Sequence, residues 1–196
     1  MLFDEELTKR LKEGDKKSFE QLFLATFESL CEYSMSITGS MEASENVVQD
    51  VFVSVWQNHT GLDDDVNVKA YLFHLVKNRS LDVVRNDKVR IKHQNSLQQG
   101  GEHDILNEAD LDEDEELQSY LIRRVNEEVE NLPEKVRVVF LLHRRDGLTY
   151  QEISQVLEIS VKAVEARMSK ALRILRDLLS GDNGFDLLST GTEGRF

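Results

Sequence analysis

The chain has 196 residues and a net charge of −13, with 24 Lys and Arg against 37 Asp and Glu. Hydrophobic residues make up 40% of it, enough for one packed domain or two small ones, and no apolar run approaches the roughly 20 residues of a membrane span. The N-terminus is acidic where a secretory signal would be basic, and the single cysteine excludes an internal disulfide and a multi-cysteine metal site. We therefore expect a soluble, cytoplasmic protein that binds no metal.

One Pro and 10 Gly among 196 residues indicate long uninterrupted helices, because the turns of sheet proteins use these two residues often. The predicted fold class is all-α. A first helix is expected over residues 18–37, where Ser18 and Gln21 match a capping box, in which each side chain bonds the other's backbone. The sequence Thr-Gly-Ser at 38–40 ends it, and residues 41–58 continue as a second helix with a wide apolar stripe.

Residues 60–65 are predicted to form a loop, after which Asn67 is placed to cap a long third helix. Residues 66–95 hold seven Lys and Arg against two Asp, a basic stretch inside an acidic protein. Residues 96–122 hold nine acidic residues and no Lys or Arg. The segment 94–116 has no apolar periodicity, so we expect a flexible acidic linker there.

Apolar periodicity resumes at residue 117, and Pro133 suits the first turn of a further helix. Gly147 stands where a left-handed turn after that helix is expected. Residues 148–153 combine a capping box (Thr149 with Glu152) with apolar residues at both ends that form a hydrophobic staple. They start a short helix, 150–157, which a tight turn joins to a second helix capped by Ser160. This pattern predicts a helix-turn-helix.

The second helix of this pair has a buried stripe and a polar, mostly basic outer face, which suits a helix lying in the major groove of DNA. Its three cations are expected to hold phosphates, whereas Glu165 and Ser169 are able to reach base edges. The alternative is an αα-hairpin with an ordinary solvated face. The outer face consists of Lys162, Glu165, Ala166, Ser169, Lys170 and Arg173.

Two sets of motifs then occur in a recognisable order. The first set is ENVVQDVFVSVW at 45–56 and AYLFHLVKN at 70–78; the second is LPEKVRVVF at 132–140, GLTYQEI at 147–153 and VEAR at 164–167. With an acidic linker between them, they resemble the extracytoplasmic-function (ECF) sigma factors of bacterial RNA polymerase. The resemblance covers roughly residues 15–92 and 117–178. It implies a region 2-like domain (1–93), the linker (94–116), a region 4-like domain (117–179) and a frayed tail (180–196).

The resemblance also implies roles for the long basic helix. That helix would read the minus-ten element of the promoter, with Asn78 holding a base pulled from the stack and Asp82 one turn further on. Tyr71 stands where the family often has Trp, so an aromatic stacking residue remains. Five cations would hold backbone phosphates, with solubility as the alternative role for each: Lys77, Arg79, Arg85, Lys88 and Arg90. The helix-turn-helix would read the minus-thirty-five element.

Core RNA polymerase is the main implied partner, through the clamp of its largest subunit and the flap of its second subunit. Phe52 is expected in the core of the domain, while the polar neighbours face the polymerase. The residues assigned to this contact are Gln49, Asp50, Val53, Trp56 and Gln57. The acidic linker would either enter a basic channel of the polymerase or serve as a solubilising spacer. Double- and single-stranded promoter DNA and an anti-sigma or recruiting protein complete the implied partners.

Two other classes of protein are compatible with parts of the sequence. A stand-alone helix-turn-helix regulator would bind a palindrome as a homodimer, but the chain has no dimerising heptads and carries a second basic helix that such a regulator does not need. An enzyme would need a phosphate loop or a nucleophile motif, and neither occurs. The five histidines show no ligand spacing, and Cys31 lies on an apolar helix face. We therefore expect no catalysis, no cofactor and no metal.

Overall fold

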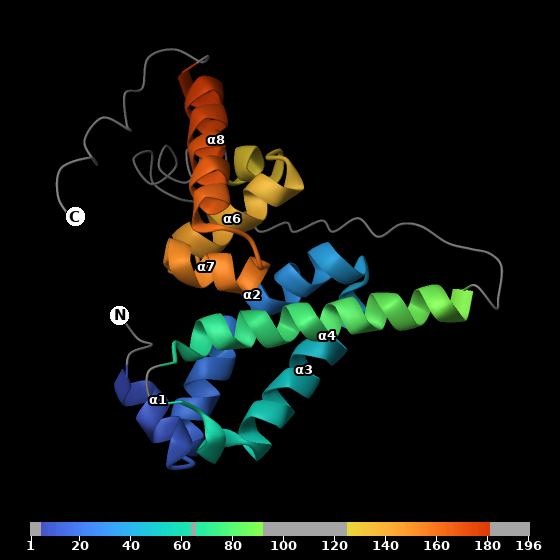
Figure 1. The fold of residues 1–196 in the computed structure, drawn as a ribbon, viewed down its shortest axis with the longest axis vertical. Helices are drawn as coiled ribbons and strands as arrows, with labels where there is room; N and C mark the ends of the chain where they lie inside the picture. Colours follow the sequence, from blue (N-terminus) through green and yellow to red (C-terminus); the bar gives the residue numbers. More distant parts are fainter. Residues whose placement is uncertain (1–4, 64–65, 92–124, 181–196) are drawn as a thin grey trace, which may run out of the picture.

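The protein is described by a computed structural model that covers residues 5–63, 66–91 and 125–180; for residues 5, 87–91 and 178–180 only the backbone is described. Regular structure within these ranges is helical (Figure 1), as the predicted all-α class requires. The elements are α1 (Glu5–Lys12), α2 (Lys16–Thr38), α3 (Met41–Gln57), the short 3₁₀ helix η1 (His59–Gly61), α4 (Val68–Ile91), α6 (Glu134–Arg144), α7 (Tyr150–Leu157) and α8 (Val161–Ser180), and residues 125–130 are also helical.

The N-terminal helices, α1–α4, pack around an apolar core that α2, α3 and α4 share. Leu30 of α2, Val48 of α3 and Leu72 of α4 are fully buried in it. A buried hydrogen bond between the Ser34 and Ser80 hydroxyls, 2.8 Å apart, joins α2 to α4 within this core. Since the bond satisfies both buried hydroxyls, it fixes how the two helices pack at no cost in unpaired polar groups.

Aromatic rings fill the contact between α2 and α3. Phe19 of α2 meets Phe52 edge-on at 5.8 Å between ring centroids and Trp56 at 4.8 Å. Phe52 is 3% exposed, so its predicted place in the core is confirmed. Trp56 is half-buried, stacks on His59 of η1 and therefore shows only part of its ring at the surface.

Among the N-terminal helices, the predicted helix ends at residues 38–40 and at Asn67 are confirmed. Gly39 ends α2 with a φ of 70°, and the Ser40 hydroxyl accepts from Ala43 N at the start of α3. Asn67 caps α4 as predicted, its Oδ1 accepting from the backbone of Lys69 and Ala70.

The predicted Ser18–Gln21 capping box is wrong, because α2 begins earlier in the chain. Asp15 is the N-cap and accepts both from Lys17 N and from the Ser18 hydroxyl. The hydrogen bond from the Ser18 hydroxyl holds the pKa of the Asp15 carboxyl below its ordinary value, and the backbone N–H groups of Lys17 and Ser18 act in the same direction. Burial opposes them with a smaller effect than that of the Ser18 hydroxyl. A carboxylate with two acceptor oxygens thus satisfies the helix end, and Ser18 becomes a buried first-turn residue.

The short helix α1 is an element that the sequence reasoning did not anticipate. Its Leu11 and Thr8 are almost fully buried, and the Thr8 hydroxyl donates to the Val66 carbonyl before α4. Eight residues are too few for a helix that is stable alone, so packing against the other N-terminal helices forms it. The sequence pattern that could have predicted α1 is the four-residue spacing of Leu7 and Leu11.

The C-terminal helices, α6–α8 with residues 125–130, follow the predicted pattern closely. Pro133 is the N-cap of α6, one position before the first-turn position predicted for it, and Gly147 has a φ of 75°. A small apolar cluster joins α6 to α8 through Val136, Ala171 and Leu175. The predicted linker 94–116, the start of the helix at 117–124 and the tail beyond Ser180 lie outside the described residues, so the predicted domain boundaries stay predictions.

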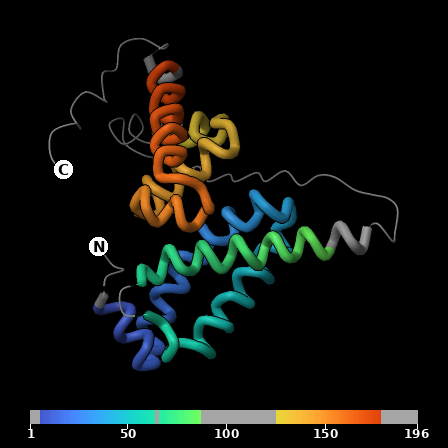
Figure 2. The backbone as a smooth tube through the Cα atoms, viewed as in Figure 1, coloured from blue at the N-terminus to red at the C-terminus, as the bar shows by residue number. Residues whose placement is uncertain are grey.

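The two groups of helices lie against each other rather than apart. Helix α7 contacts the first half of α4 (Figure 2), and the main apolar core continues from α4 into α6, α7 and α8 through Leu142, Ile153 and Met168. None of the helices described is long and apolar enough to cross a membrane.

Candidate nucleic-acid interface

The helix-turn-helix is built by caps at both of its helices. The Thr149 hydroxyl accepts from Glu152 N at the start of α7, and the Glu152 carboxylate accepts from Thr149 N at 2.7 Å, so the predicted capping box is confirmed. The Ser160 hydroxyl accepts from Ala163 N and caps α8. The turn between the helices passes through Glu158, the one described non-glycine residue with positive φ, at 55°. The two caps and the turn at Glu158 fix the angle between α7 and α8 through residues that are close in the sequence.

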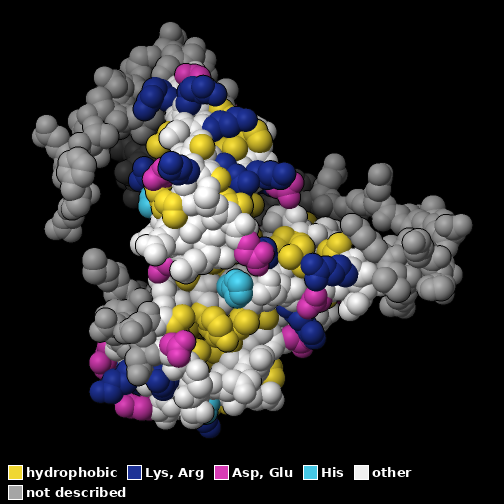
Figure 3. Space-filling view, viewed as in Figure 1, with side chains coloured by type: hydrophobic (Ala, Val, Ile, Leu, Met, Phe, Trp, Pro, Cys, Tyr) yellow, Lys and Arg dark blue, Asp and Glu magenta, His cyan; other side chains and the backbone are white. Residues whose placement is uncertain are grey.

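The outer face of α8 is not covered by any other described part of the chain. Its buried side consists of Val164, Met168, Ala171 and Leu175. In the part of the chain that the structure describes, no carboxylate holds a cation of the outer face. Lys and Arg side chains gather over the part of the surface where α8 lies (Figure 3). The side chains at all six predicted positions are exposed: Lys162, Glu165, Ala166, Ser169, Lys170 and Arg173.

The predicted minus-ten residues of α4 fall into an exposed group and a covered group. Asn78 is exposed, and its Nδ2 lies 3.0 Å from His74 Nε2 one turn earlier. Tyr71 is half-buried. Lys77 is covered: its side chain is 13% exposed and its Nζ lies 3.0 Å from the Glu158 carboxylate of the helix-turn-helix.

The remaining cations of α4 meet carboxylates at the surface. Arg79 lies 3.1 Å from Asp50 of α3, so the structure pairs a residue predicted to hold DNA with one predicted to contact the polymerase. Arg85 lies 3.4 Å from Asp82 on its own helix. Both pairs are more than half exposed and therefore contribute little to stability, which leaves each side chain available for another partner. Lys88 and Arg90 lie on α4, but their side chains are outside the description.

The residues predicted to contact the polymerase lie along α3. Val53 is 55% exposed, an unusual position for a large apolar side chain, and it lies on the opposite side of α3 from the buried Val51 and Val55. Gln49, Asp50 and Gln57 are exposed as well. This face of α3 is thus polar around the exposed apolar side chain of Val53, which is compatible with a protein-binding surface.

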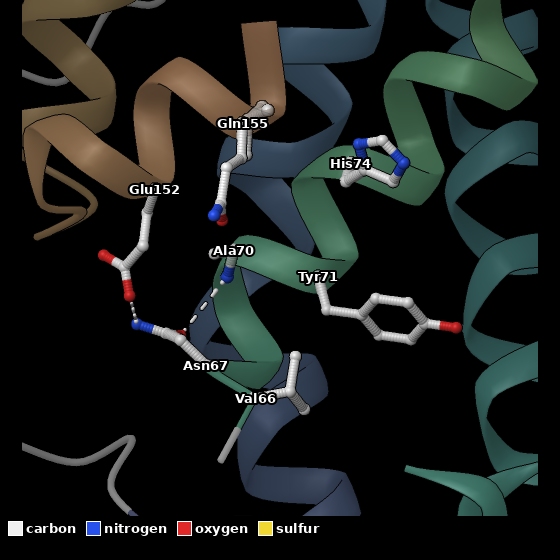
Figure 4. A pocket seen from close by; sticks show the side chains of 8 residues that line it. Val66, Asn67, Ala70, Tyr71, His74, Glu152 and Gln155 are labelled. Carbon is white, nitrogen blue, oxygen red and sulfur yellow. Dashed lines mark hydrogen bonds between the residues drawn. The ribbon is translucent and has the colours of Figure 1, made fainter. Parts of the chain in front are cut away.

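Polar contacts join the helix-turn-helix to α4 and α2. Asn67 Nδ2 donates to Glu152 Oε1 at 2.7 Å, so the residue that caps α4 is bonded to the residue that completes the cap of α7 (Figure 4). Lys69 Nζ lies 3.7 Å from Asp146 Oδ1, with both side chains nearly buried, and Arg145 pairs with Glu32 of α2. Burial lowers the pKa of Lys69, and the Asp146 carboxylate opposes this effect.

A pocket of about 370 Å³ remains between α4 and α7. Asn67, Tyr71 and His74 line it from one side, and Glu152 and Gln155 from the other. The Tyr71 ring points away from Glu152 (Figure 4). Sequence reasoning assigned Glu152 to a cap and Glu158 to a turn, and both assignments are confirmed. It missed their second contacts, with Asn67 and Lys77, because no local pattern encodes a partner 85 residues away.

Comparison with known proteins identifies both halves of the chain. The family model for sigma-70 region 2 matches residues 24–90, and the model for sigma-70 region 4 matches residues 122–175. Together they cover more than half of the chain, in the order that the motifs predicted. The chain belongs to the sigma-70 family. It is a sigma factor that directs RNA polymerase to promoters, which decides against the stand-alone regulator.

Similar proteins place this sigma factor in the ECF group, as the sequence resemblance predicted. The ECF RNA polymerase sigma-E factor of Haemophilus influenzae is 24% identical over 180 residues, covering 90% of this chain and 95% of the relative. The RNA polymerase sigma factor CnrH of Cupriavidus metallidurans is 28% identical over 185 residues, covering 92% and 96%.

Two solved structures share the fold. CnrH in complex with the cytosolic domain of CnrY matches with a TM-score of 0.53 at 26% identity, over 92% of this chain and 99% of that one. The sigma factor RpoE in complex with the anti-sigma factor NepR, from Bartonella quintana, matches with a TM-score of 0.60 at 19% identity, over 85% and 99%.

Proposed function

We propose that the sigma factor reads the minus-thirty-five element with the outer face of α8 and the minus-ten element with α4. The observation that carries this proposal is the capped helix-turn-helix whose second helix turns six polar or small residues, three of them cationic, to the surface. Lys162, Lys170 and Arg173 hold phosphates and fix the register, and Glu165 and Ser169 lie on the same face to reach base edges. The chain acts in the cytoplasm, through binding and not through catalysis.

For the minus-ten element, the proposal assigns the base pocket to the middle of α4. Asn78 offers amide donors and an acceptor to the edge of an unstacked base, and the exposed position of its side chain supports this role. Tyr71 supplies an aromatic ring on the same side of α4, two turns before Asn78. The phosphate contacts are those of Lys77, Arg79, Arg85, Lys88 and Arg90, with Asp82 beside them.

The proposal assigns two further kinds of partner. Core polymerase contacts α3 through Gln49, Asp50, Val53, Trp56 and Gln57, a surface on which Val53 is the exposed apolar residue. An anti-sigma protein binds the chain when it is inactive, a proposal that rests on the RpoE structure, which contains the anti-sigma factor NepR.

Size-exclusion chromatography of the chain with excess core polymerase tests the first step. We expect co-elution at the size of the polymerase, and run-off transcription over genomic fragments then identifies promoters. Replacing Val53 with Ser is expected to weaken co-elution, whereas the same change at Leu24, a still more exposed apolar residue on α2, serves as the matched control. Separate elution, with a control sigma factor binding the same core preparation, contradicts the proposal.

A further inference from the structure

His74 and Asn78 lie one turn apart on α4, and their side chains are in contact. The amide nitrogen of Asn78, Nδ2, lies 3.0 Å from Nε2 of the His74 ring. No other hydrogen bond or ion pair of the Asn78 side chain occurs among the described residues. Because side chains four residues apart are neighbours on a helix surface, α4 itself brings the two groups together.

The chemistry of the two nitrogen atoms decides which of them donates. An amide nitrogen carries two N–H groups and offers no lone pair, so Asn78 is the donor and His74 Nε2 is the acceptor. The His74 ring in this contact is therefore neutral, with its proton on Nδ1. The carbonyl oxygen and the second N–H of Asn78 stay free. His74 thus fixes on which side the amide presents its oxygen and on which side its nitrogen.

The orientation of the amide determines which bases it matches. On their Watson–Crick edges, adenine and cytosine present an amino donor beside a ring-nitrogen acceptor, whereas guanine and thymine present a carbonyl acceptor beside a ring N–H. An amide binds either pattern with its oxygen and one N–H, but a half-turn about its Cβ–Cγ bond exchanges the two patterns. An amide that is free to turn therefore accepts both classes of base, whereas a fixed amide accepts one class.

We propose that His74 is a positioning residue for base recognition. By accepting from Asn78 Nδ2, it sets whether the amide takes an amino base (adenine or cytosine) or a keto base (guanine or thymine). The inference rests on the proposed assignment of Asn78 to the unstacked base, and it adds the residue that selects the class of base. His74 is half-buried where α4 lines the pocket beside α7 (Figure 4), whereas Asn78 is exposed, so the contact leaves the amide accessible to a base.

Two substitutions of His74, one by an acceptor and one by a donor, test the proposal. In His74→Glu the carboxylate accepts from Asn78 Nδ2 as the imidazole does, so the amide keeps its orientation. In His74→Lys the ammonium group only donates, so the amide turns and directs its oxygen toward it. The two variants change the net charge in opposite directions. Since this charge acts on the phosphates of every template alike, the ratio between templates removes its effect.

The first readout is promoter opening by holoenzyme on templates that differ in one base. Each position of the minus-ten element of a promoter found by run-off transcription is changed to the three other bases. The position read by Asn78 is the one whose base preference disappears in Asn78→Ala. There we expect the parent protein to prefer one class of base by roughly tenfold. His74→Glu keeps this preference, His74→Leu weakens it because its side chain holds no amide, and His74→Lys reverses it toward the other class.

The parent preference in His74→Lys, at a position where Asn78→Ala abolishes it, overturns the proposal. Failure of the proposed function appears differently, because then no position of the minus-ten element loses its preference in Asn78→Ala, and the present inference fails with it. Circular dichroism checks that each variant is folded.

The second readout needs no DNA. NMR of the full chain, at a pH where the His74 ring is neutral, reports which ring nitrogen carries the proton. We expect the proton on Nδ1 in the parent chain and a larger share on Nε2 in Asn78→Ala, because the amide that binds Nε2 is then gone. A ring protonated on Nε2 in the parent chain overturns the proposal, as does a distribution of the proton that Asn78→Ala leaves unchanged.

Discussion

Single side chains in this sigma factor serve two neighbours at once. Glu152 completes the cap of α7 and accepts from Asn67 at the start of α4. Glu158 adopts a left-handed conformation, φ 55°, that Gly would adopt with less strain. Its carboxylate binds Lys77, which gives a physical reason for a glutamate at this turn.

At this scale Asn78 is the residue that decides whether α4 holds a base. Asn78→Ala removes the amide that the proposal aims at the unstacked base, and such a contact is worth about 1–3 kcal/mol. We expect open-complex formation by holoenzyme, followed by permanganate footprinting, to fall by roughly tenfold or more. Co-elution with core polymerase stays unchanged.

The exposed amide Asn86, two turns further along α4, provides the control. Asn86→Ala is expected to open promoters at the parent rate. Equal opening by the Asn78 variant and the parent protein would remove Asn78 from the base pocket.

Whole helices divide their faces between core and ligand. Helix α8 buries Val164, Met168 and Leu175 on one side and leaves its cations on the other. Helix α4 has no such simple division, because it is buried against α2 and α3 on one side and against α7 on another. A helix with two buried faces gains stability from both.

The outer face of α8 predicts a change in salt dependence. Replacing Lys170 and Arg173 with Ala removes two proposed phosphate contacts, and each such contact contributes about 0.9 to the slope of log affinity against log salt. We therefore expect holoenzyme to bind a minus-thirty-five duplex more weakly, with a slope smaller by roughly 2. Filter binding at several salt concentrations measures it.

Loss of two positive charges elsewhere is the comparison for this variant. Lys9→Ala/Lys16→Ala, on exposed positions of α1 and α2, changes the net charge equally and is expected to keep the parent slope. A similar slope for both double variants would mean that the outer face of α8 does not hold phosphates.

The core of α4 predicts a large effect on stability. Phe73 is fully buried and meets Tyr33 of α2 edge-on, with ring centroids 5.4 Å apart. Phe73→Ala leaves a cavity and is expected to lower the free energy of unfolding by about 3–5 kcal/mol. Urea denaturation measures this, with Leu24→Ala as control, because Leu24 is 72% exposed and its loss is expected to change stability by less than about 0.5 kcal/mol. A loss near zero at Phe73 would contradict its burial.

At the scale of the whole molecule, the two groups of helices are joined by contacts that respond to charge. Three cations, Lys69, Lys77 and Arg145, are paired across the boundary between the two groups of helices. The apolar part of the contact is continuous with the main core and keeps the two groups of helices together. The ion pairs fix how the two groups are positioned relative to each other. A contact built this way weakens when a carboxylate is protonated.

Glu158 gives this weakening a direction in pH. Its hydrogen bond and ion pair with Lys77 hold the pKa of the carboxyl below its ordinary value of 4.5. Because the folded chain lowers the pKa, the stability contributed by this pair is fully present above pH 4.5 and is lost as the pH falls through the lowered value. NMR titration of the Glu158 carboxyl carbon is expected to show a midpoint below 4.5 that rises in Lys77→Ala. Identical midpoints in the two proteins would contradict the pair.

The sequence by itself determined the longer helices, most of their caps and the outer face of α8, because these features depend on residues within one or two turns of each other. Thr149, Glu152 and Ser160 are the clearest cases. The order of the motifs along the sequence was also sufficient to predict the family. The sequence prediction placed the start of α2 at Ser18 instead of Asp15. Both residues suit an N-cap, and only the packing decides that Ser18 is the one that is buried.

Only the tertiary structure decided that Asn67 meets Glu152 and that Lys77 meets Glu158. These pairs are separated by 85 and 81 residues, with an acidic segment between them, and no periodicity relates them. The same holds for α1, which packing stabilises, and for the covered state of a helix that the sequence presents as an open basic surface. Local physical chemistry fixes which face a helix offers, whereas the partner that covers the face is set by the packing of the whole chain.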